Sequence, residues 1–278
     1  MNGAIVVLFN PTKKDLRNIL DYVYKVDRTL IIDNSESNHF DELCSFIKID
    51  NRDVMYKHNK KNLGLSKTMN DGIKYLQSLG CKWVLTMDHD SNFKTNIIDV
   101  YKNYIESNNT RKVAVLAPLF DYDRHKERPY EGFKNVNWKM MSGNFLNTNV
   151  FLKLNGFKEI FFVDGLDMEY CLHAKEKGYK VIECGQAILK HKPAETRSIQ
   201  VYGKTIFKYG YASPLRYYYQ AKSLTWICIK YRNFEIFMIY LYKLFKILFL
   251  FDKKLLFLSN YVKGTKEGIQ ISKRHFQN

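Results

Sequence analysis

The chain has 278 residues and a mass of 33.0 kDa, with 46% hydrophobic and 26% charged residues. This composition predicts a packed core and excludes a globally disordered chain. The 44 Lys and Arg against 28 Asp and Glu leave a formal charge of +16, which indicates an anionic partner: a phosphorylated ligand, an acidic membrane or nucleic acid. Residues 192–278 carry +12 of that charge, with 16 basic and 4 acidic side chains, and the preceding residues carry only +4.

Cysteine usage and the N-terminal sequence both favour a cytoplasmic protein. The five cysteines form no CxxC pair and are widely spaced, which is unlike a disulfide framework or a zinc site. The apolar run at residues 4–9 has no basic region before it and is too short for a signal peptide.

The first 120 residues alternate short apolar runs with amphipathic stretches. The runs are typical of buried strands and lie at residues 4–9, 29–32, 54–56, 83–87 and 113–116. The stretches between them predict helices at residues 12–26, 41–48, 66–79 and 94–107. This alternation predicts an α/β fold in which a mostly parallel sheet carries helices on both faces.

After Pro118 the alternation weakens. Residues 120–137 predict a loop or lid, and a short helix ends at Gly156. A second helix is predicted from about Asp164 to Lys177, followed by two short strands at residues 179–182 and 187–189.

From about Ile199 the composition is basic, aromatic and typical of helices, and residues 234–251 are the most apolar stretch. At about 100° per residue, Glu235, Lys243, Lys246, Lys253 and Lys254 gather within about 100° of arc, which predicts a basic amphipathic helix.

Polar residues follow four of the predicted strands. Ligands of such sheets bind beyond the carboxyl ends of the strands, so these residues are expected to share one edge. They are Asn10, Asp33 with Asn34, His58 with Asn59, and Asp88 with His89 and Asp90.

Asp88 and Asp90 place two carboxylates two residues apart at a strand end. Their mutual repulsion favours a hard divalent cation such as Mg²⁺ or Mn²⁺, which prefers oxygen ligands and often shares them with substrate phosphates. His191, just after a strand in the same half as the acids, is a plausible third ligand. The alternative is that Asp90 or Ser91 caps the next helix.

Two helix starts also carry candidate chemistry. Residues 58–66 offer amides, lysines and Gly64 before a helix, which suits a diphosphate, or they form a plain turn capped by Ser66. Asp164, Asp167 and Glu169 lie at another helix start, where Asp164 could cap and one of the acids could serve as a general base.

Taken in order, these motifs resemble the family 2 inverting glycosyltransferases of the GT-A fold, and within them a bacterial rhamnosyltransferase branch. The resemblance covers residues 3–262, and the later Arg216-Tyr217-Tyr218-Tyr219 also matches that branch. The motifs are Asn10-Pro11, Ile32-Asp33-Asn34-Ser35, Asn59 with Asn62-Leu63-Gly64, Asn70-Asp71-Gly72, Asp88-His89-Asp90-Ser91, Ser142-Gly143, Gly156-Phe157, Phe162-Val163-Asp164, Asp167-Met168-Glu169-Tyr170, Gly178-Tyr179 and Leu189-Lys190-His191.

The resemblance implies a catalytic domain at residues 1–195, with a nucleotide-sugar half at 1–117 and an acceptor half at 118–195, followed by a helical basic region at 196–278. It also implies a role for each motif residue. The nucleoside would be contacted by Asn10, Asp33, Asn34 and Asn59, and its pocket and the approach to the diphosphate would be shaped by Asn62, Gly64 and Asn70. Asp88 would lie near the ribose, and Ser142 and Gly143 would lie beside the donor sugar. The metal would be bound by Asp90 and His191.

Asp167 would be the base, with Glu169 positioning it or the acceptor and Asp164 competing for its role. The implied reaction is metal-dependent transfer of L-rhamnose from dTDP-rhamnose to a saccharide or lipid-linked acceptor in bacterial surface polysaccharide synthesis. A UDP-sugar donor is the alternative.

The basic C-terminal region leaves three interpretations open. It could lie on anionic lipid at the cytoplasmic face of the inner membrane, which suits a lipid-linked acceptor. It could pack on the catalytic domain or form a homodimer. Nucleic-acid binding would explain the pI of about 9.4, but the strand-end acids oppose it and no nucleic-acid motif occurs.

Overall fold

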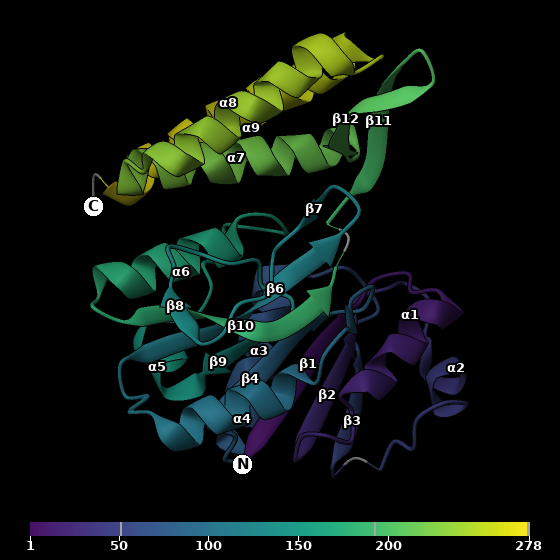
Figure 1. Ribbon diagram of the computed structural model, residues 1–278, viewed down its shortest axis with the longest axis vertical. Coiled ribbons are helices and arrows are strands. Elements are labelled where there is room, and N and C mark those ends of the chain that lie inside the picture. The colour runs from purple at the N-terminus through teal and green to yellow at the C-terminus, as the bar shows by residue number, and fades with distance from the viewer. Residues whose placement is uncertain (51, 192, 277–278) are drawn as a thin grey trace.

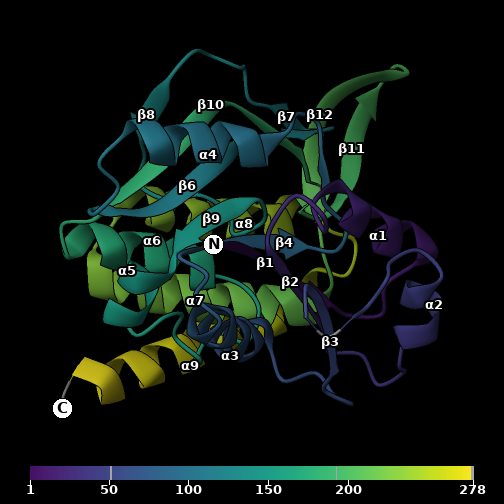
Figure 2. The ribbon, with the colours of Figure 1, turned by 90° about the horizontal axis from the view of Figure 1, so that it is seen from below.

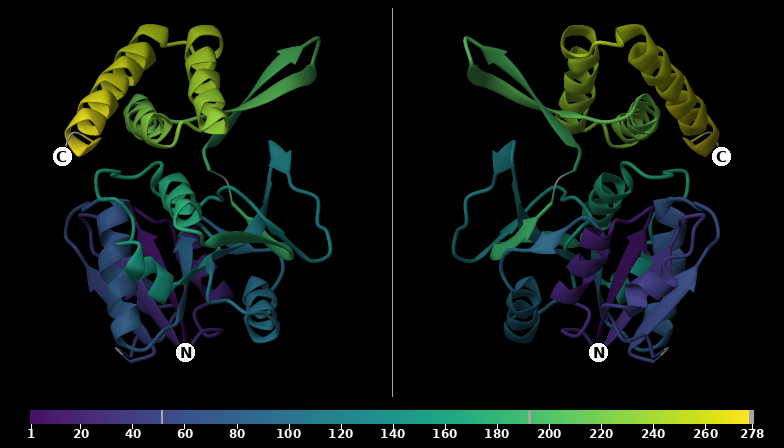
Figure 3. Two further views of the ribbon diagram at one scale, coloured as in Figure 1. Left: turned by 90° about the vertical axis from the view of Figure 1, so that its left-hand side faces the viewer. Right: turned by 90° about the vertical axis from the view of Figure 1, so that its right-hand side faces the viewer.

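The computed structural model describes residues 1–50, 52–191 and 193–276. Over these residues the chain forms a mixed ten-stranded sheet with helices on both faces, followed by a β-hairpin and three long helices (Figure 1). The three helices form a separate layer above the carboxyl ends of the first strands (Figures 1 and 3).

The first half of the sheet is parallel, as the strand–helix alternation predicts. Its strands lie in the order β3-β2-β1-β4. They are β1 (Asn2–Leu8), β2 (Arg28–Asp33), β3 (Val54–His58) and β4 (Trp83–Asp88).

The second half is mixed and continues from β4 in the order β9-β6-β10-β5. The short β9 is antiparallel to both β4 and β6, whereas β6 and β10 are parallel. The strands are β5 (Asn92–Phe93), β6 (Val113–Tyr122), β7 (His125–Lys126), β8 (Phe133–Asn135), β9 (Asn144–Asn147) and β10 (Lys180–Lys190).

Side chains of the central strands alternate between two cores, one on each face of the sheet. In β1, Ile5 and Val7 pack with α3, α5 and α6, whereas Val6 and Leu8 pack with α1, α2 and α4 (Figure 2). The helices are α1 (Lys13–Asn18), the 3₁₀ turn η1 (Ile19–Asp21), α2 (Phe40–Cys44), α3 (Leu65–Ser78), α4 (Ile97–Ser107), α5 (Thr148–Lys153) and α6 (Leu166–Glu176).

The region after Pro118 is more ordered than its polar composition predicts. The predicted loop at 120–137 contains the end of β6 and the strands β7 and β8. The two strands predicted at 179–189 are one strand, β10, with a register shift between Glu183 and Ile188. At that irregularity a Cβ on Gly185 would lie 2.2 Å from the carbonyl oxygen of Tyr130. Any residue other than glycine would therefore clash with the segment that carries Tyr130.

The prediction of helix from about Ile199 is wrong for its first part. Residues there form a β-hairpin of β11 (Glu195–Val201) and β12 (Lys204–Tyr211). The physical reason is its turn, in which Tyr202 and Gly203 both have positive φ, the two-residue geometry that suits strand twist. β-branched and aromatic residues on either side then favour strands over helix.

The rest of the C-terminal region is helical, as predicted, and within the described residues its three helices cover an aromatic cluster built around Tyr217, Phe251, Phe257 and Tyr261. Helix α7 lies nearest the catalytic sheet, and α8 and α9 lie beyond it (Figure 3). They are α7 (Pro214–Tyr231), α8 (Phe234–Leu250) and α9 (Lys254–Phe276).

Helix α8 is amphipathic in the opposite sense from an ordinary surface helix. Lys246 is buried and Lys243 is half-buried on its inner face, while its outer face exposes apolar side chains at helical spacing. We call these residues the α8 stripe: Phe234, Phe237, Met238, Leu241, Tyr242, Phe245, Leu248 and Phe249. Among the helices within the described ranges, none is both long and apolar enough to cross a bilayer.

Candidate active site

A cleft of about 1050 Å³ separates the carboxyl ends of the parallel strands from the C-terminal helices and hairpin. Its two walls carry opposite charge. The sheet-side wall holds the acids Asp88, Asp90, Asp164 and Asp167 with His191. The opposite wall holds the cations Arg124, Lys208, Arg216, Lys243 and Lys246.

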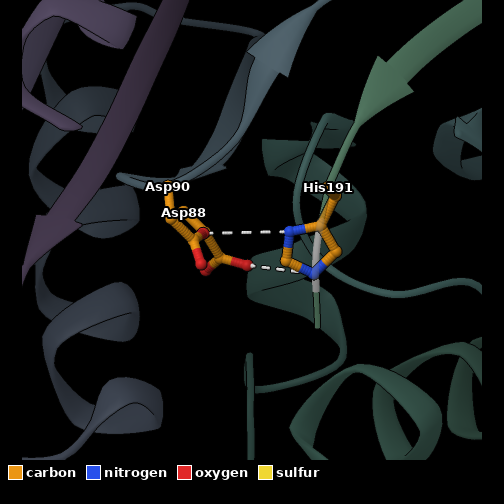
Figure 4. Close-up of side chains that lie close together, drawn as sticks. All are labelled: Asp88, Asp90 and His191. Carbon is orange, nitrogen blue, oxygen red and sulfur yellow. Dashed lines mark ion pairs between the residues drawn. The ribbon is translucent and has the colours of Figure 1, made fainter. Parts of the chain in front are cut away.

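Asp88, Asp90 and His191 form the one cluster with metal-ligand geometry among the residues that the structure describes. One ligand atom from each lies within 4.8 Å of the others. The His191 ring faces both carboxylates, with Nε2 3.8 Å from Asp88 Oδ2 and Nδ1 3.8 Å from Asp90 Oδ1 (Figure 4). The strand-end prediction therefore brings together two residues of β4 and its turn with one that lies 100 residues later.

The surroundings of this cluster suit a divalent cation. Burial and the negative charge of Asp88 raise the pKa of Asp90. The two carboxylates therefore have too little positive charge around them to offset their mutual repulsion. Ser91 Oγ lies 2.8 Å from His191 Nδ1 and accepts a hydrogen bond of 2.8 Å from Ser142 Oγ. With Nδ1 donating to Ser91, Nε2 keeps its lone pair, as a metal ligand requires.

These contacts do not support the capping alternative. Ser91 is held by His191 and Ser142, and the next helix, α4, has Asn96 as its N-cap residue. Ser142 Oγ also accepts a hydrogen bond from the backbone N–H of Asp88, so this serine fixes the turn that carries both carboxylates.

The predicted nucleoside contacts form a connected network at the ends of β1, β2 and β3. Asp33 is fully buried and accepts hydrogen bonds from Tyr56 Oη and from the backbone N–H groups of Ser35 and His39. Burial acts to raise the pKa of Asp33, but the hydrogen bonds from Ser35, His39 and Tyr56 outweigh it and lower that pKa. Asp33 is therefore a charged, rigid anchor beside the cleft.

Asn34 and Asn62 line the cleft, whereas Asn59 and Asn10 are not among its lining residues. Asn34 Oδ1 accepts a 2.8 Å hydrogen bond from Asn59 Nδ2, which fixes the Asn34 amide. Asn10 has a left-handed backbone with φ of 48° and donates its N–H to Ser35 Oγ at 2.7 Å. The network thus places two amides at the cleft surface and two in support.

Gly64 is the N-cap residue of α3, with φ of 82°, and a Cβ there would lie 2.7 Å from the Phe162 ring. Asn62 Oδ1 accepts its N–H at 2.9 Å. The alternative of a Ser66 cap is wrong, because Ser66 Oγ instead donates to the carbonyl oxygen of Phe161.

Asn70 and Gly143, two further predicted donor-site residues, also lie outside the cleft lining. Asn70 is buried and exchanges two 2.8 Å hydrogen bonds with the backbone of Phe157. Gly143, with φ of 81°, packs so closely that a Cβ would lie 2.9 Å from Leu189 and from Pro118. Both positions join strands and helices rather than contact the cleft.

Asp167 lies in the first turn of α6 and its carboxyl group faces the cleft. Its Oδ1 accepts the backbone N–H of Met168 at 2.9 Å. Burial raises the pKa of Asp167 to about 6, and the negative charges of Asp164 and Asp88 act in the same direction. A carboxylate with this pKa takes up a proton more readily than an ordinary surface aspartate.

Asp164 is occupied by an ion pair. Arg216 of α7 donates to both of its oxygens at 2.8 Å, Nε to Oδ2 and Nη2 to Oδ1. The predicted cap at Asp164 is wrong, since the N-cap residue of α6 is Gly165 with φ of 90°, where a Cβ would lie 2.6 Å from Ser223 Cβ. Asp164 therefore links the sheet to α7.

Glu169 points away from the cleft, because two helical residues differ by about 200° and Asp167 faces inward. It is fully buried, accepts a 2.7 Å hydrogen bond from Tyr231 Oη, and has Lys230 Nζ at 3.9 Å. Burial raises the pKa of Glu169. This acid joins α6 to the end of α7.

Sequence reasoning missed the cationic wall of the cleft. Arg124 precedes β7, Lys208 lies on β12, and Lys243 and Lys246 lie on α8, so no local motif connects them. Their only sequence signal was the lysine arc of α8, for which the prediction left open an anionic lipid surface, packing on the catalytic domain or a homodimer, and did not name the cleft.

Comparisons with known proteins agree with this geometry. The chain is 24% identical to the dTDP-rhamnosyl transferase RfbF of Shigella flexneri, over 79% of this chain and 77% of the relative. It is 23% identical to the low-salt glycan biosynthesis hexosyltransferase Agl10 of Haloferax volcanii, over 72% of this chain and 71% of that one.

A solved structure has the same fold. The crystal structure of GalNAc-T7 with UDP, GalNAc and Mn²⁺ superposes with a TM-score of 0.60 at 12% identity, covering 99% of this chain. The chain spans 57% of the length of that solved chain. The arrangement of sheet and helices is therefore the GT-A fold, as predicted.

The model of the glycosyl transferase family 2 matches residues 4–164, which is more than half of the chain and ends at the acid that pairs with Arg216. That span contains the parallel strands, the nucleoside network and both acidic members of the metal-ligand cluster. The protein is a glycosyltransferase that uses a nucleotide-sugar donor, and it belongs to glycosyl transferase family 2.

Proposed function

We propose that this protein transfers L-rhamnose from dTDP-L-rhamnose to a hydroxyl group of a saccharide acceptor, with inversion at the anomeric carbon. The observation that carries the proposal is a single cleft in which Asp167 and the Asp88–Asp90–His191 cluster lie together. The similarity to the rhamnosyl transferase RfbF supports the donor.

In this proposal Asp90, Asp88 and His191 hold Mg²⁺ or Mn²⁺. The bound cation would supply positive charge against the diphosphate of the donor. Asn34 and Asn62 face the nucleoside at the cleft surface, while Asp33, Asn59 and Asn10 keep that surface rigid. Ser142 and Ser91 hold the His191 ring.

The displacement needs one base and no covalent nucleophile. The acceptor oxygen attacks the anomeric carbon as the bond from that carbon to the phosphate oxygen breaks, and the electron pair leaves with the nucleoside diphosphate. Asp167 receives the proton of the acceptor hydroxyl. Asp164 is disfavoured as the base because both of its oxygens accept from Arg216.

The donor is tested with a panel of nucleotide sugars in the presence of Mn²⁺, by thermal shift and then by calorimetry. We expect dTDP-rhamnose alone to bind in a metal-dependent manner. Binding of a UDP-sugar instead would keep the glycosyltransferase and reject the rhamnosyl donor. Absence of binding by every donor to folded protein would reject the proposed function.

We also propose that the protein lies on the cytoplasmic face of the membrane through the α8 stripe. Phe234 is 74% exposed and Phe249 66% exposed, so the stripe offers large aromatic side chains to an apolar phase. Lys253 and Lys254 are exposed directly after the helix, where they can meet anionic headgroups. The alternative occupant is a second copy of the chain.

A further inference from the structure

One part of the cleft is apolar, in contrast to its two charged walls. We call it the methionine patch, and its residues, all of which line the cleft, are Trp138, Met140, Met141, Leu166 and Met168. Met141 and Leu166 are 5% and 2% exposed and belong to the core cluster on which Trp138 and Met168 pack. Met140 and Met168 are half-buried, so both contribute apolar surface to the cleft rather than to the core alone.

The patch extends from the support of the metal-ligand cluster to the base. Met141 directly precedes Ser142, whose Oγ accepts the backbone N–H of Asp88 at 3.1 Å. Met168 directly follows Asp167 and donates its backbone N–H to that carboxylate. Because the acceptor oxygen attacks the anomeric carbon opposite the leaving phosphate, the donor sugar of the proposed reaction lies between the metal-bound diphosphate and the base. The methionine patch therefore lies beside the ring of the donor sugar.

The polar groups of the segment that carries the patch are bonded to other parts of the protein. The indole N–H of Trp138 donates to Glu235 Oε1 at 2.9 Å. Lys139 Nζ donates to both carboxylate oxygens of Glu127, at 2.7 and 2.9 Å. A hydroxyl group placed on the patch would lose its water and meet thioether and hydrocarbon surface instead, which is unfavourable. A methyl group in the same place would be stabilised by its burial.

The proposed donor sugar has such a methyl group. L-rhamnose is a 6-deoxy sugar, so its C6 is a methyl group where the corresponding hexose carries a hydroxyl. We propose that the methionine patch binds the C6 methyl group of the donor sugar and selects a 6-deoxy sugar over the hexose of the same configuration. This inference rests on the proposed function, because it names the residues that would distinguish the proposed donor from a hexose donor.

The test compares dTDP-L-rhamnose with dTDP-L-mannose, which differs from it only by the hydroxyl group at C6. The binding of each to the full chain is measured by calorimetry in Mn²⁺, without acceptor. We expect the wild-type chain to prefer dTDP-L-rhamnose by about 10- to 100-fold, the range in which an apolar pocket rejects an added hydroxyl.

Glutamine variants of the two half-buried methionines should remove this preference. Met140→Gln and Met168→Gln each place an amide of similar length on the patch, which can hydrogen-bond to a C6 hydroxyl. We expect each variant to bring the two affinities within about threefold, mainly by tighter binding of dTDP-L-mannose. Met168→Leu should keep the preference. Leu79→Gln adds the same amide at an exposed position outside the cleft and should leave both affinities unchanged.

A measurement on the wild-type chain tests the contact itself. With isotope-labelled methionine methyl groups, assigned through Met140→Leu and Met168→Leu, we expect a nuclear Overhauser effect between the C6 methyl group of bound dTDP-L-rhamnose and at least one of these methionines. This measurement and the wild-type preference decide the question even if thermal melting shows that a glutamine variant is unfolded.

Three results would overturn the inference: equal affinity of the wild-type chain for the two donors, an unchanged preference in both folded glutamine variants, or no Overhauser effect from either methionine in the complex. An equal loss of affinity for both donors in the glutamine variants would overturn it as well, because it would show that the methionines maintain the shape of the site without distinguishing C6.

Failure of the proposed function has a separate signature. In that case the wild-type chain would bind neither of the two dTDP-sugars in Mn²⁺, whatever group C6 carries. Failure of the inference alone would leave Mn²⁺-dependent binding of dTDP-L-rhamnose intact and remove only the preference at C6.

Discussion

Asp167 and Asp164 lie three residues apart at the start of α6, and their surroundings give them different chemistry. Asp164 is held by Arg216, whereas Asp167 faces the cleft with only a backbone donor. Asp167→Asn should lower the transfer rate by about 10² to 10⁴, the usual contribution of a general base. Donor binding, measured by calorimetry, should stay unchanged. Transfer within threefold of wild type would show that another group is the base.

The raised pKa of Asp167 predicts an acid limit of activity. A base works only when deprotonated, so kcat/KM should be constant above about pH 6 and fall about tenfold per pH unit below the Asp167 pKa of about 6. Circular dichroism over the same pH range separates this loss from unfolding. A limb near pH 4 would mean that an ordinary surface carboxylate controls the rate.

Replacement of Asp90, which we propose as a metal ligand, should uncouple donor binding from the cation. In wild type, Mn²⁺ should tighten nucleotide-sugar binding at least tenfold, and EDTA should reverse this. In Asp90→Ala the affinity should equal that of wild type in EDTA and should not respond to Mn²⁺, because the cluster loses one of its three ligands. A variant that keeps the Mn²⁺ response would place the metal elsewhere.

At the scale of single residues, motif reasoning located the cleft acids but not the direction in which every acid points. Asp88, Asp90, Asp167 and His191 reach the cleft, as their strand-end and helix-start positions predict. Glu169 does not, since its neighbour by two positions already occupies the inward face of α6. Which face of a helix turns inward depends on packing by α7, far along the chain.

The contact between α6 and the end of α7 has its own testable strength. Tyr231→Phe removes the hydroxyl that donates to buried Glu169, whose Oε2 already has no partner among the residues described. We expect a loss of about 1–3 kcal/mol in the free energy of unfolding, measured in urea, with little change in donor affinity. Tyr202→Phe, at the fully exposed hairpin tip, is the control. Equal stability of both variants would contradict this role of Glu169.

The α8 stripe predicts lipid binding through exposed aromatic side chains. Phe245→Ser with Phe249→Ser should lower the affinity for phosphatidylglycerol vesicles about tenfold per residue, since a fully buried Phe is worth about 1.5–3 kcal/mol. Leu20→Ser changes an exposed apolar residue of the other face and should leave vesicle binding intact. If the chain is dimeric and the stripe variants become monomeric without any change on vesicles, a second copy covers the stripe instead.

Whole strands and helices could be predicted from the sequence where the residues that cause them are neighbours in the chain. The parallel strands β1 to β4 and the helices between them carry continuous apolar runs and helical spacing, and each of them forms, although the helix predicted at residues 12–26 is only α1 (Lys13–Asn18) and the 3₁₀ turn η1 (Ile19–Asp21). The hairpin at 195–211 was missed because its turn, Tyr202-Gly203, is an uncommon pair for that geometry and its strands are mostly exposed. Helix α8 was expected, but the sequence left open whether it meets lipid, the catalytic domain or a second copy, and only tertiary packing turns its lysines inward.

At the scale of the whole molecule, the +16 charge has two separate locations. Some of it lines the cleft opposite the acids, and some lies on exposed residues of the last helices. The exposed part is screened by salt, whereas the buried lysines of the cleft are screened much less. Vesicle binding should therefore weaken with ionic strength more steeply than nucleotide-sugar binding in the cleft does.

Arg124 apart, the two walls of the cleft come from successive parts of the chain, and this order has an evolutionary consequence. The sheet-side wall lies within or beside the family-matched residues 4–164, whereas Arg216, Lys243 and Lys246 lie beyond them. Substitutions in the C-terminal helices can accumulate without disturbing the strands of the sheet. A relative can thus acquire a new glycan partner by exchanging its last third while inheriting its activated sugar unchanged.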